Sequence, residues 1–282
     1  MRVAVYGLGR MGRHHARHLS GLGAEVVEVD PSLGLHGDAR GVDAAVLATP
    51  TRTHAELASS LSRDGIPVLV EKPLAASLPE AEALSTIPGL VVGHVERFNP
   101  AMGALFDSSL DVRFVQAERL APWTDRALDV DVVYDLMVHD LDLFGLVTGF
   151  AEVADVRGNG LGVATSGPDI AHARVETVDG RVAVLSTSRI SPATVRKFRA
   201  FGPGAYVGLD LAARTAHRVG RDLRSEPIAV HEFDALRAEL EAFLLWVEGG
   251  CLALDPGPRR LATVDEALWT LRLAERIRCA SA

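Results

Sequence analysis

A glycine-rich turn near the N-terminus constrains the fold of this chain more than any other feature. The apolar run RVAVY (residues 2–6) leads directly into GLGRMG, which places Gly7, Gly9 and Gly12 in G-x-G-x-x-G spacing before a helical pattern. Glycines at these positions permit a tight turn and a close approach of the backbone to a pyrophosphate, which the helix N–H groups then bind. The pattern indicates a dinucleotide site, with a glycine turn in another kind of α/β protein as the alternative.

A carboxylate follows at the place where such a site needs one. Asp30 ends the second apolar run, AEVVEVD (24–30). There it would accept hydrogen bonds from the ribose hydroxyls of adenosine and repel a 2′-phosphate. We therefore expect NAD as the cofactor, with NADP left open.

Apolar strand-like runs alternate with helical segments through the first part of the chain. The runs cover residues 2–7, 24–30, 43–50, 66–73 and 90–98. Continuous hydrophobic strands between helices are typical of a parallel sheet covered on both faces. We predict an α/β fold in which a Rossmann doubly wound parallel sheet occupies residues 1–118.

The second part of the chain has a different pattern. Strand-like runs separated by Gly, Pro and Asp follow a helix predicted at about 129–149, and two helical segments end the chain. This pattern indicates an α+β domain (119–282) with a large, mostly antiparallel sheet. We expect this domain to bind substrate and form oligomers, with its last helices packing back between the domains.

Composition restricts the partners of the protein. The formal charge of −8 and the dispersed arginines argue against a nucleic-acid surface. The sequence has no apolar run of membrane-spanning length, no signal-peptide pattern, and two cysteines without C-x-x-C or zinc spacing. We expect a cytoplasmic protein that binds small molecules and no membrane, and forms a homodimer or homotetramer through its C-terminal sheet.

Lysine is almost absent from the chain. Of 29 Lys and Arg residues, only Lys72 and Lys197 are lysine. The two residue types are equivalent as solvated charges, but only lysine can be desolvated to a pKa near neutrality and exchange a proton. Lys72 is therefore a candidate functional residue, with an ordinary surface lysine as the alternative.

Five motifs in order give the chain a family resemblance. GLGRMG, ATPTRTHAE (48–56), EKPLA (71–75), GHVERFNPA (93–101) and DLMVHDLDL (135–143) resemble the glucose-fructose oxidoreductase / inositol dehydrogenase (Gfo/Idh/MocA) family over essentially the whole chain. The last two motifs are most similar to bacterial members that oxidise the 3-hydroxyl of UDP-N-acetylglucosamine. Relatives usually have a longer helical connection than residues 31–43 provide after Asp30, which weakens the assignment of Asp30.

The resemblance implies roles for individual residues. It implies that Lys72 lies beside the nicotinamide and the substrate hydroxyl, that His139 takes the hydroxyl proton, and that Asp135 holds substrate or orients the imidazole. The expected cofactor-binding residues are Gly7, Gly9, Arg10, Met11, Gly12, Asp30, Thr49, Pro50, His54, Glu71 and Lys72. The expected substrate-binding residues are Arg97, Asn99, Arg119, Asp135 and His139. Pro73 is expected to shape the turn, often through a cis peptide bond.

Less specific interpretations stay open for several of these residues. Glu71 and His139 can be structural, and Asp135, His139 and Asp142 resemble a metal triad, which a dinucleotide site makes less favourable. The basic residues Arg97, Arg119, Arg189, Arg196, Lys197 and Arg199, with Asn99 beside them, fit either a diphosphate site or a solvated sheet face or dimer contact. His14, His15 and His18 on the first helix have no third ligand nearby, so we expect solvated residues and no metal.

The sequence thus predicts an NAD(P)-dependent oxidoreductase that transfers hydride between nicotinamide and a secondary hydroxyl of a sugar or nucleotide sugar. One alternative is a catalytically inert dinucleotide sensor, which the presence of both Lys72 and His139 disfavours. Another is a reductase of an imine or a tetrapyrrole-like substrate, which needs little from Asp135. The fold alone does not choose the substrate.

Overall fold

The computed structural model describes residues 1–37, 39–124, 130–252, 254 and 257–280. Contacts within the chain divide it into two units. Unit 1 contains Met1–Phe98 and Asp234–Leu268, and unit 2 contains Asn99–Phe233 and Trp269–Ala282. The first boundary lies at Phe98, where we expected one near residue 118, because helix α4 (Pro100–Phe106) packs on strands of the second sheet.

Unit 1 is built on a sheet that, among the described residues, has seven strands in the order β15-β6-β5-β4-β1-β2-β3. Its strands are β1 (Arg2–Tyr6), β2 (Glu25–Asp30), β3 (Leu35–His36), β4 (Ala44–Leu47), β5 (Val68–Glu71), β6 (Leu90–Gly93) and β15 (Ala262–Thr263). The five strands from β6 to β2 are parallel, which confirms the predicted doubly wound sheet. The two edge strands are antiparallel and too short to leave a sequence pattern.

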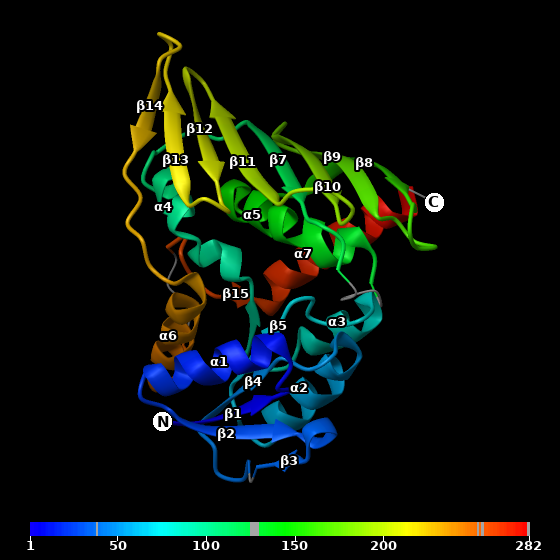
Figure 1. Cartoon of the computed structure of the whole chain (residues 1–282), viewed down its shortest axis with the longest axis vertical. Coiled ribbons are helices and arrows are strands. Elements are labelled where there is room, and N and C mark those ends of the chain that lie inside the picture. Colours follow the sequence, from blue (N-terminus) through cyan, green and yellow to red (C-terminus); the bar gives the residue numbers. More distant parts are fainter. Residues whose placement is uncertain (38, 125–129, 253, 255–256, 281–282) are drawn as a thin grey trace. The chain divides into compact units, whose positions relative to one another are not determined.

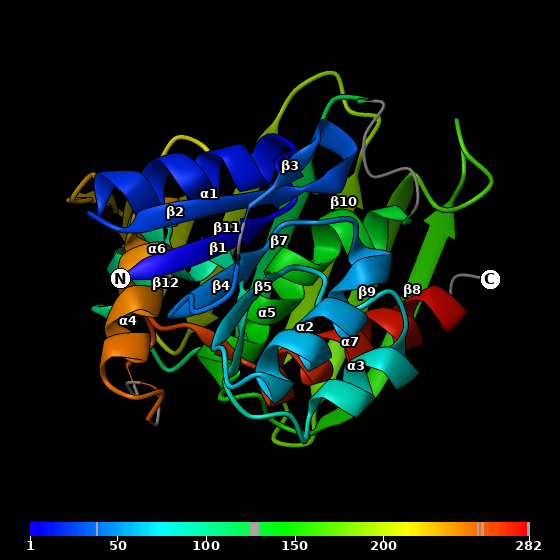
Figure 2. The same ribbon diagram turned by 90° about the horizontal axis from the view of Figure 1, so that it is seen from below.

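Helices cover both faces of this sheet (Figure 2). Helices α1 (Arg10–Gly21) and α6 (Ala235–Glu248) lie on one face, and α2 (His54–Arg63) and α3 (Leu78–Leu84) lie on the other. Alternate residues of β1 point to the first face, where Val3 and Val5 share a buried cluster with Leu19 of α1 and Phe243 of α6. Burial on both faces explains why these strands are continuous apolar runs rather than alternating ones.

The strand predicted at residues 90–98 is too long. β6 ends at Gly93, and Val95–Phe98 form a turn of 3-10 helix, η3. Val95 and Phe98 are three residues apart, which is a helical spacing, and the turn brings Phe98 into the buried cluster of unit 1. Tertiary packing of Phe98 therefore decides the local structure here.

Unit 2 contains a second sheet, with eight strands in its described part, in the order β14-β13-β12-β11-β7-β10-β9-β8 (Figure 1). Its strands are β7 (Phe114–Leu120), β8 (Val153–Leu161), β9 (Ile170–Thr177), β10 (Val182–Ser188), β11 (Val195–Gly202), β12 (Ala205–Asp210), β13 (Thr215–Val219) and β14 (Ser225–Ile228). Every neighbouring pair is antiparallel except β7 and β10. The predicted large, mostly antiparallel sheet is confirmed.

The helix predicted at about 129–149 has two parts. Val133–Met137 form a π-helical turn, η4, and α5 continues from Val138 to Thr148, while residue 129 lies outside the described residues. Gly149 ends α5 with a positive φ of 69°. Helix α7 (Val264–Ala280) begins in unit 1 and ends in unit 2. Across the described residues, no helix is both long and apolar enough to span a membrane.

Candidate functional site

The glycine turn in unit 1 has the geometry that a phosphate-binding loop requires. Gly7 has a positive φ of 84°, and a Cβ there would lie 2.8 Å from the carbonyl oxygen of Ala48. A Cβ at Gly12 would overlap the carbonyl oxygen of Gly7, whereas a Cβ at Gly9 would have nothing within 4 Å. Gly7 and Gly12 are thus needed by the protein itself, and the space beside Gly9 is available to a ligand.

The first turn of α1 offers backbone N–H groups that have no acceptor within the helix. Arg10 and Met11 begin the helix, Gly9 is its N-cap, and no acidic residue occupies the first turn. The Arg13 side chain holds the loop by donating from Nε to the carbonyl oxygen of Leu8 at 2.8 Å. The N-terminal end of a helix favours negative charge, so this end suits a pyrophosphate.

Asp30 connects the end of β2 to the glycine loop. Its Oδ2 accepts the backbone N–H of Leu8 at 2.7 Å, and its Oδ1 accepts the hydroxyl and N–H of Ser32 at 2.6 and 3.1 Å. The Ser32 hydroxyl and then the Leu8 N–H lower the pKa of the Asp30 carboxyl. The carboxylate is therefore ionised at neutral pH, and it both fixes the loop and presents a negative charge.

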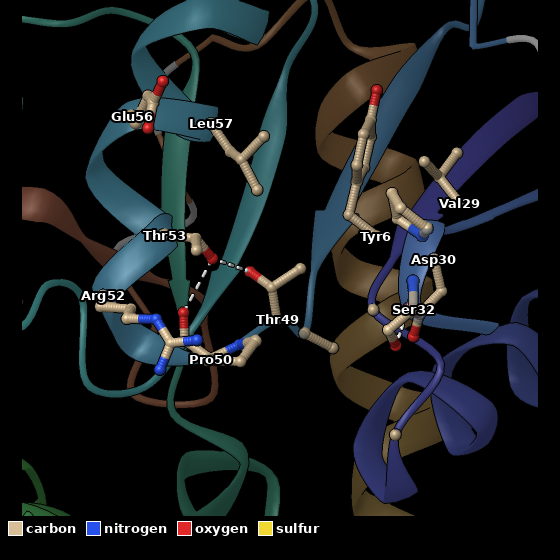
Figure 3. A pocket seen from close by; sticks show the side chains of 14 residues that line it. Tyr6, Val29, Asp30, Ser32, Thr49, Pro50, Arg52, Thr53, Glu56 and Leu57 are labelled. Carbon is tan, nitrogen blue, oxygen red and sulfur yellow. Dashed lines mark hydrogen bonds between the residues drawn. The ribbon is translucent and has the colours of Figure 1, made fainter. Parts of the chain in front are cut away.

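A pocket of about 730 Å³ lies beside these groups. In Figure 3, Asp30 and Ser32 lie on one side of it and Thr53, Glu56 and Leu57 on the other. Its lining residues are Tyr6, Gly7, Gly9, Val29, Asp30, Pro31, Ser32, Ala48, Thr49, Pro50, Arg52, Thr53, Glu56 and Leu57. Gly7, Gly9, Asp30, Thr49 and Pro50 were expected from the sequence. The short connection after Asp30 also contributes, because Pro31 and Ser32 form part of the wall.

The loop after β4 is held by hydroxyl contacts within the pocket. The Thr53 hydroxyl lies 2.7 Å from the Thr49 hydroxyl and 2.8 Å from the carbonyl oxygen of Pro50, as the dashed lines in Figure 3 show. The next residue, His54, is 1% exposed and begins α2. Its Nε2 lies 3.0 Å from the carbonyl oxygen of Thr49. The structure thus places His54 behind the pocket wall, where it supports Thr49.

The E-K-P segment begins at the last residue of β5, at the same edge of the sheet. Glu71 ends β5, and the Lys72–Pro73 peptide bond is cis. Glu71 Oε2 accepts the Lys72 N–H at 3.2 Å, and the Pro73 carbonyl oxygen lies 3.0 Å from His54 Nδ1. Glu71, Lys72 and His54 do not line the 730 Å³ pocket.

The histidines of α1 differ from one another. His14 and His18 are partly exposed, but His15 is 0% exposed and its Nε2 lies 2.7 Å from Glu71 Oε1. The expectation that all three are solvated is therefore wrong for His15. The i, i+4 pattern drew attention to His14 and His18. The signal for His15 was its place beside Ala16 and Leu19 on the apolar side of the helix.

In unit 2, Asp135 and His139 share one face of a helix. Asp135 lies on η4 and His139 on the first turn of α5, and both are partly exposed. Their neighbours Tyr134, Met137 and Val138 are buried. The two side chains therefore lie on the accessible face of this helix, as the i, i+4 spacing predicts.

Polar contacts hold the turn that carries Asp135. Asp131 Oδ1 accepts the N–H groups of Val133 and Tyr134 at 3.0 and 3.1 Å. The Tyr134 hydroxyl donates to Glu275 Oε2 at 2.8 Å, and the guanidinium of Arg278 forms an ion pair with Asp131. Burial and the Glu275 carboxylate raise the pKa of the Tyr134 hydroxyl, so it stays a donor at neutral pH. The end of α7 thus fixes the start of the helix that carries Asp135 and His139.

Asp142 is more buried than these two residues, being 1% exposed, whereas Asp135 and His139 are partly exposed. In the part of the chain that the structure describes, no group of three or more His, Cys, Asp or Glu side chains is placed to hold a metal ion. The geometry gives no support to the metal triad considered from the sequence.

The expected substrate-binding residues near residue 100 are buried. Arg97 is 0% exposed and donates from Nη1 to Glu266 Oε2 at 2.8 Å within unit 1. Asn99 caps α4 through the N–H of Ala101 and donates from Nδ2 to the carbonyl oxygen of Leu211. These contacts favour structural roles over direct contact with substrate.

Arg119 and the later basic residues also have protein partners. Arg119 forms a buried ion pair with Asp140. Arg189 Nη2 donates to the carbonyl oxygen of Val130 at 2.8 Å, and Lys197 Nζ lies 2.5 Å from Asp210. Three of these basic residues thus contact groups of unit 2 itself, and Arg196 lies opposite Arg119 on the neighbouring strand.

Comparison with known proteins identifies the family to which the chain belongs. A family model described as "Oxidoreductase family, NAD-binding Rossmann fold" (GFO_IDH_MocA) matches residues 33–87. UDP-N-acetylglucosamine 3-dehydrogenase of Acidithiobacillus ferrooxidans is 35% identical over 275 residues, which cover 86% of this chain and 88% of that protein. The chain belongs to the Gfo/Idh/MocA family of oxidoreductases.

Two further comparisons extend over nearly all of the chain. Myo-inositol dehydrogenase Hyg17 of Streptomyces leeuwenhoekii is 31% identical, covering 98% of this chain and 97% of that protein. The solved structure of the Acidithiobacillus ferrooxidans enzyme, GnnA, has a TM-score of 0.88 and 33% identity, covering 100% of this chain and 97% of that one. This Gfo/Idh/MocA member is an NAD-binding dehydrogenase, and its glycine loop and Asp30 fit that cofactor.

Proposed function

We propose that this protein oxidises a secondary hydroxyl of a sugar or nucleotide sugar, and that its substrate is a UDP-N-acetylhexosamine oxidised at the 3-hydroxyl. The similarity to UDP-N-acetylglucosamine 3-dehydrogenase over most of both chains supports this substrate class. A second candidate is an inositol, which the similarity to Hyg17 favours.

The observation that carries the proposal is the position of Lys72 on the sheet of unit 1. The glycine loop, Thr49 and Lys72 follow β1, β4 and β5, which are adjacent parallel strands. Their carboxyl ends lie at one edge of the sheet, where ligands bind in open α/β folds. A dinucleotide held by the glycine loop and Asp30 would extend along this edge toward Lys72.

NAD, when bound, accepts hydride at C4 of its nicotinamide. The residues of the chain orient the substrate and move the proton of its hydroxyl. In the proposal, Lys72 contacts that hydroxyl, His139 takes its proton, and Asp135 holds the sugar or orients the imidazole. Proton transfer by a positioned side chain contributes about 10²- to 10⁴-fold to the rate.

The proposal also covers where and in what form the enzyme works. We place it in the cytoplasm, as a homodimer or homotetramer formed through the sheet of unit 2. An inert dinucleotide sensor is the rival from another class, and it would need neither Lys72 nor the accessible pair of Asp135 and His139.

A spectrophotometric screen tests the proposal. Purified protein is incubated with NAD or NADP and with UDP-N-acetylglucosamine, UDP-N-acetylgalactosamine, free N-acetylhexosamines, myo-inositol or aldoses, and absorbance at the wavelength of the reduced cofactor is followed. We expect reduction with a UDP-N-acetylhexosamine and little with the free sugars. Turnover of inositol alone would move the assignment to the second candidate, and tight NAD binding without turnover of any alcohol would favour the sensor.

A further inference from the structure

His15 on α1 is a buried ionisable group that the proposed mechanism does not use. Its side chain is 0% exposed, and its Nε2 lies 2.7 Å from Oε1 of Glu71, the residue before Lys72. The helix that follows the glycine loop therefore contacts the E-K-P segment through one imidazole. His14, its neighbour on the same helix, keeps part of its surface exposed and contacts Arg17 instead.

The surroundings of His15 determine where its proton lies. Among the residues that the structure describes, none forms a hydrogen bond with its Nδ1. A neutral imidazole has one N–H. If the proton were on Nδ1, that N–H would be unsatisfied and the Nε2 lone pair would face a carboxylate. The proton therefore lies on Nε2, which donates a charge-assisted hydrogen bond to Glu71.

Glu71 also forms a hydrogen bond with the backbone of Lys72. Its second oxygen, Oε2, accepts the Lys72 N–H at 3.2 Å. Burial by itself raises the pKa of Glu71, but the hydrogen bond and electrostatic interaction with His15, together with the charge and the backbone N–H of Lys72, outweigh it and lower that pKa. The carboxylate is thus ionised, with one oxygen on the imidazole and the other on the residue that follows it.

The residue on the other side of Lys72 is also held. The carbonyl oxygen of Pro73 lies 3.0 Å from Nδ1 of His54, whose side chain is buried. Both sequence neighbours of Lys72 therefore contact a buried imidazole. Glu71 does so through its carboxylate, with a histidine of α1, and Pro73 through its carbonyl oxygen, with a histidine of α2. A lysine side chain has many rotamers, so a fixed backbone limits the region that its ammonium group reaches.

We propose that His15 is a positioning residue for Lys72, acting through the carboxylate of Glu71. This inference rests on the proposed function, in which Lys72 contacts the substrate hydroxyl. A displacement of about 1 Å at a reacting group can cost about 10²-fold in rate, so loss of the contact acts on turnover rather than on cofactor affinity.

Kinetics of matched variants test the proposal. His15→Leu fills similar space without a hydrogen bond, His15→Gln keeps an amide donor near the position of Nε2, and His14→Leu is the control on the same helix. We expect His15→Leu to lower kcat by about tenfold to 100-fold, with the Kd of NAD, measured by calorimetry, unchanged. His15→Gln should regain most of the loss, and His14→Leu should match the wild type.

A second readout does not depend on activity. Because the chain has only two lysines, labelling with ¹³C-lysine gives one Cε signal from Lys72 and one from Lys197, and Lys197→Arg assigns them. We expect the Lys72 signal to move in His15→Leu and in Glu71→Gln, and to stay in place in His14→Leu. This measurement tests the positioning of Lys72 even if the screen finds no alcohol substrate.

The outcomes separate the two proposals. A Lys72 signal that does not respond to His15→Leu or Glu71→Gln overturns the positioning role, whether or not the protein is a dehydrogenase. A loss of kcat that His15→Gln does not recover, together with a lower midpoint of urea unfolding, assigns His15 to packing and also overturns it. If His15→Leu does not fold, Glu71→Gln removes the carboxylate charge from the other side of the contact and decides the question.

Discussion

Arg119 and Asp140 form a buried ion pair through two hydrogen bonds. Arg119 donates from Nε to Oδ2 at 3.0 Å and from Nη2 to Oδ1 at 2.8 Å, and the two residues are 3% and 2% exposed. The pair joins β7 to α5 one residue after His139. The charge that the sequence suggested for a substrate phosphate is therefore used to fix the helix that carries the proposed base.

This pair predicts an asymmetric effect of substitution on stability. Arg119→Met should lower the free energy of unfolding by about 3–5 kcal/mol, because it leaves the Asp140 carboxylate buried without its charged partner. The double variant Arg119→Met/Asp140→Leu should recover much of that loss. Urea unfolding followed by tryptophan fluorescence measures both. If Arg119→Met has normal stability but binds substrate poorly, Arg119 contacts the substrate and the structural role is contradicted.

The glycine loop predicts different consequences for two glycines. Gly9→Val should leave the fold intact and weaken NAD binding at least tenfold, about 1.4 kcal/mol. Apart from its chain neighbours, no described residue lies within 4 Å of a Cβ at Gly9, so the new side chain would contact the ligand. Gly12→Ala should instead lower the free energy of unfolding by about 1–3 kcal/mol, because its Cβ would overlap the backbone of Gly7. Calorimetric titration and thermal unfolding check the pair. Unchanged NAD affinity in Gly9→Val would contradict the cofactor position.

Asp30 predicts the choice between NAD and NADP. Asp30→Asn removes the negative charge but keeps an oxygen that can accept the Leu8 N–H, so it separates charge from support of the loop. The ratio of NADP to NAD affinity should rise about tenfold or more in Asp30→Asn, because repulsion of a 2′-phosphate disappears. Asp30→Ala should show the same change in ratio with weaker binding of both cofactors. If the wild type prefers NADP tenfold or more, the placement of Asp30 at the adenosine ribose is wrong.

Lys72 and His139 predict a shared role in proton transfer. Lys72→Met and His139→Asn should each raise the barrier by about 3 to 4 kcal/mol with NAD affinity little changed. Because both serve one proton, the double variant should be far less impaired than the product of the single effects. Lys72→Arg should also lose most activity, since a guanidinium is larger and does not exchange its proton at neutral pH.

Lys197→Arg is the matched control for Lys72. Lys197 forms an ion pair with Asp210 on the sheet of unit 2, which arginine can retain. The Lys197→Arg variant should therefore have single-turnover rates near the wild-type value. Near-normal turnover of Lys72→Arg on the natural substrate would make Lys72 an ordinary cation and leave the chemistry to His139.

The sequence was a good guide wherever local patterning decides the structure. The parallel strands of unit 1, the glycine loop and the antiparallel sheet of unit 2 follow from apolar runs and turn residues, because these patterns act over a few neighbouring residues. The place of Asp30 beside the loop was also predicted, since the carboxyl ends of adjacent parallel strands meet at one edge. The sequence also singled out Lys72 directly, because lysine is rare in this chain.

Several buried charged residues contact partners that are distant in the sequence. Arg97 meets Glu266, Arg119 meets Asp140, and His15 meets Glu71. A charged residue in a short motif looks the same whether it contacts a ligand or a carboxylate from another element. Burying a charge requires such a partner, and only the folded chain brings the partner within reach. The sequence by itself therefore determined the sheets, the cofactor loop and the family of this protein, whereas the tertiary structure decided which partners its buried charged residues contact.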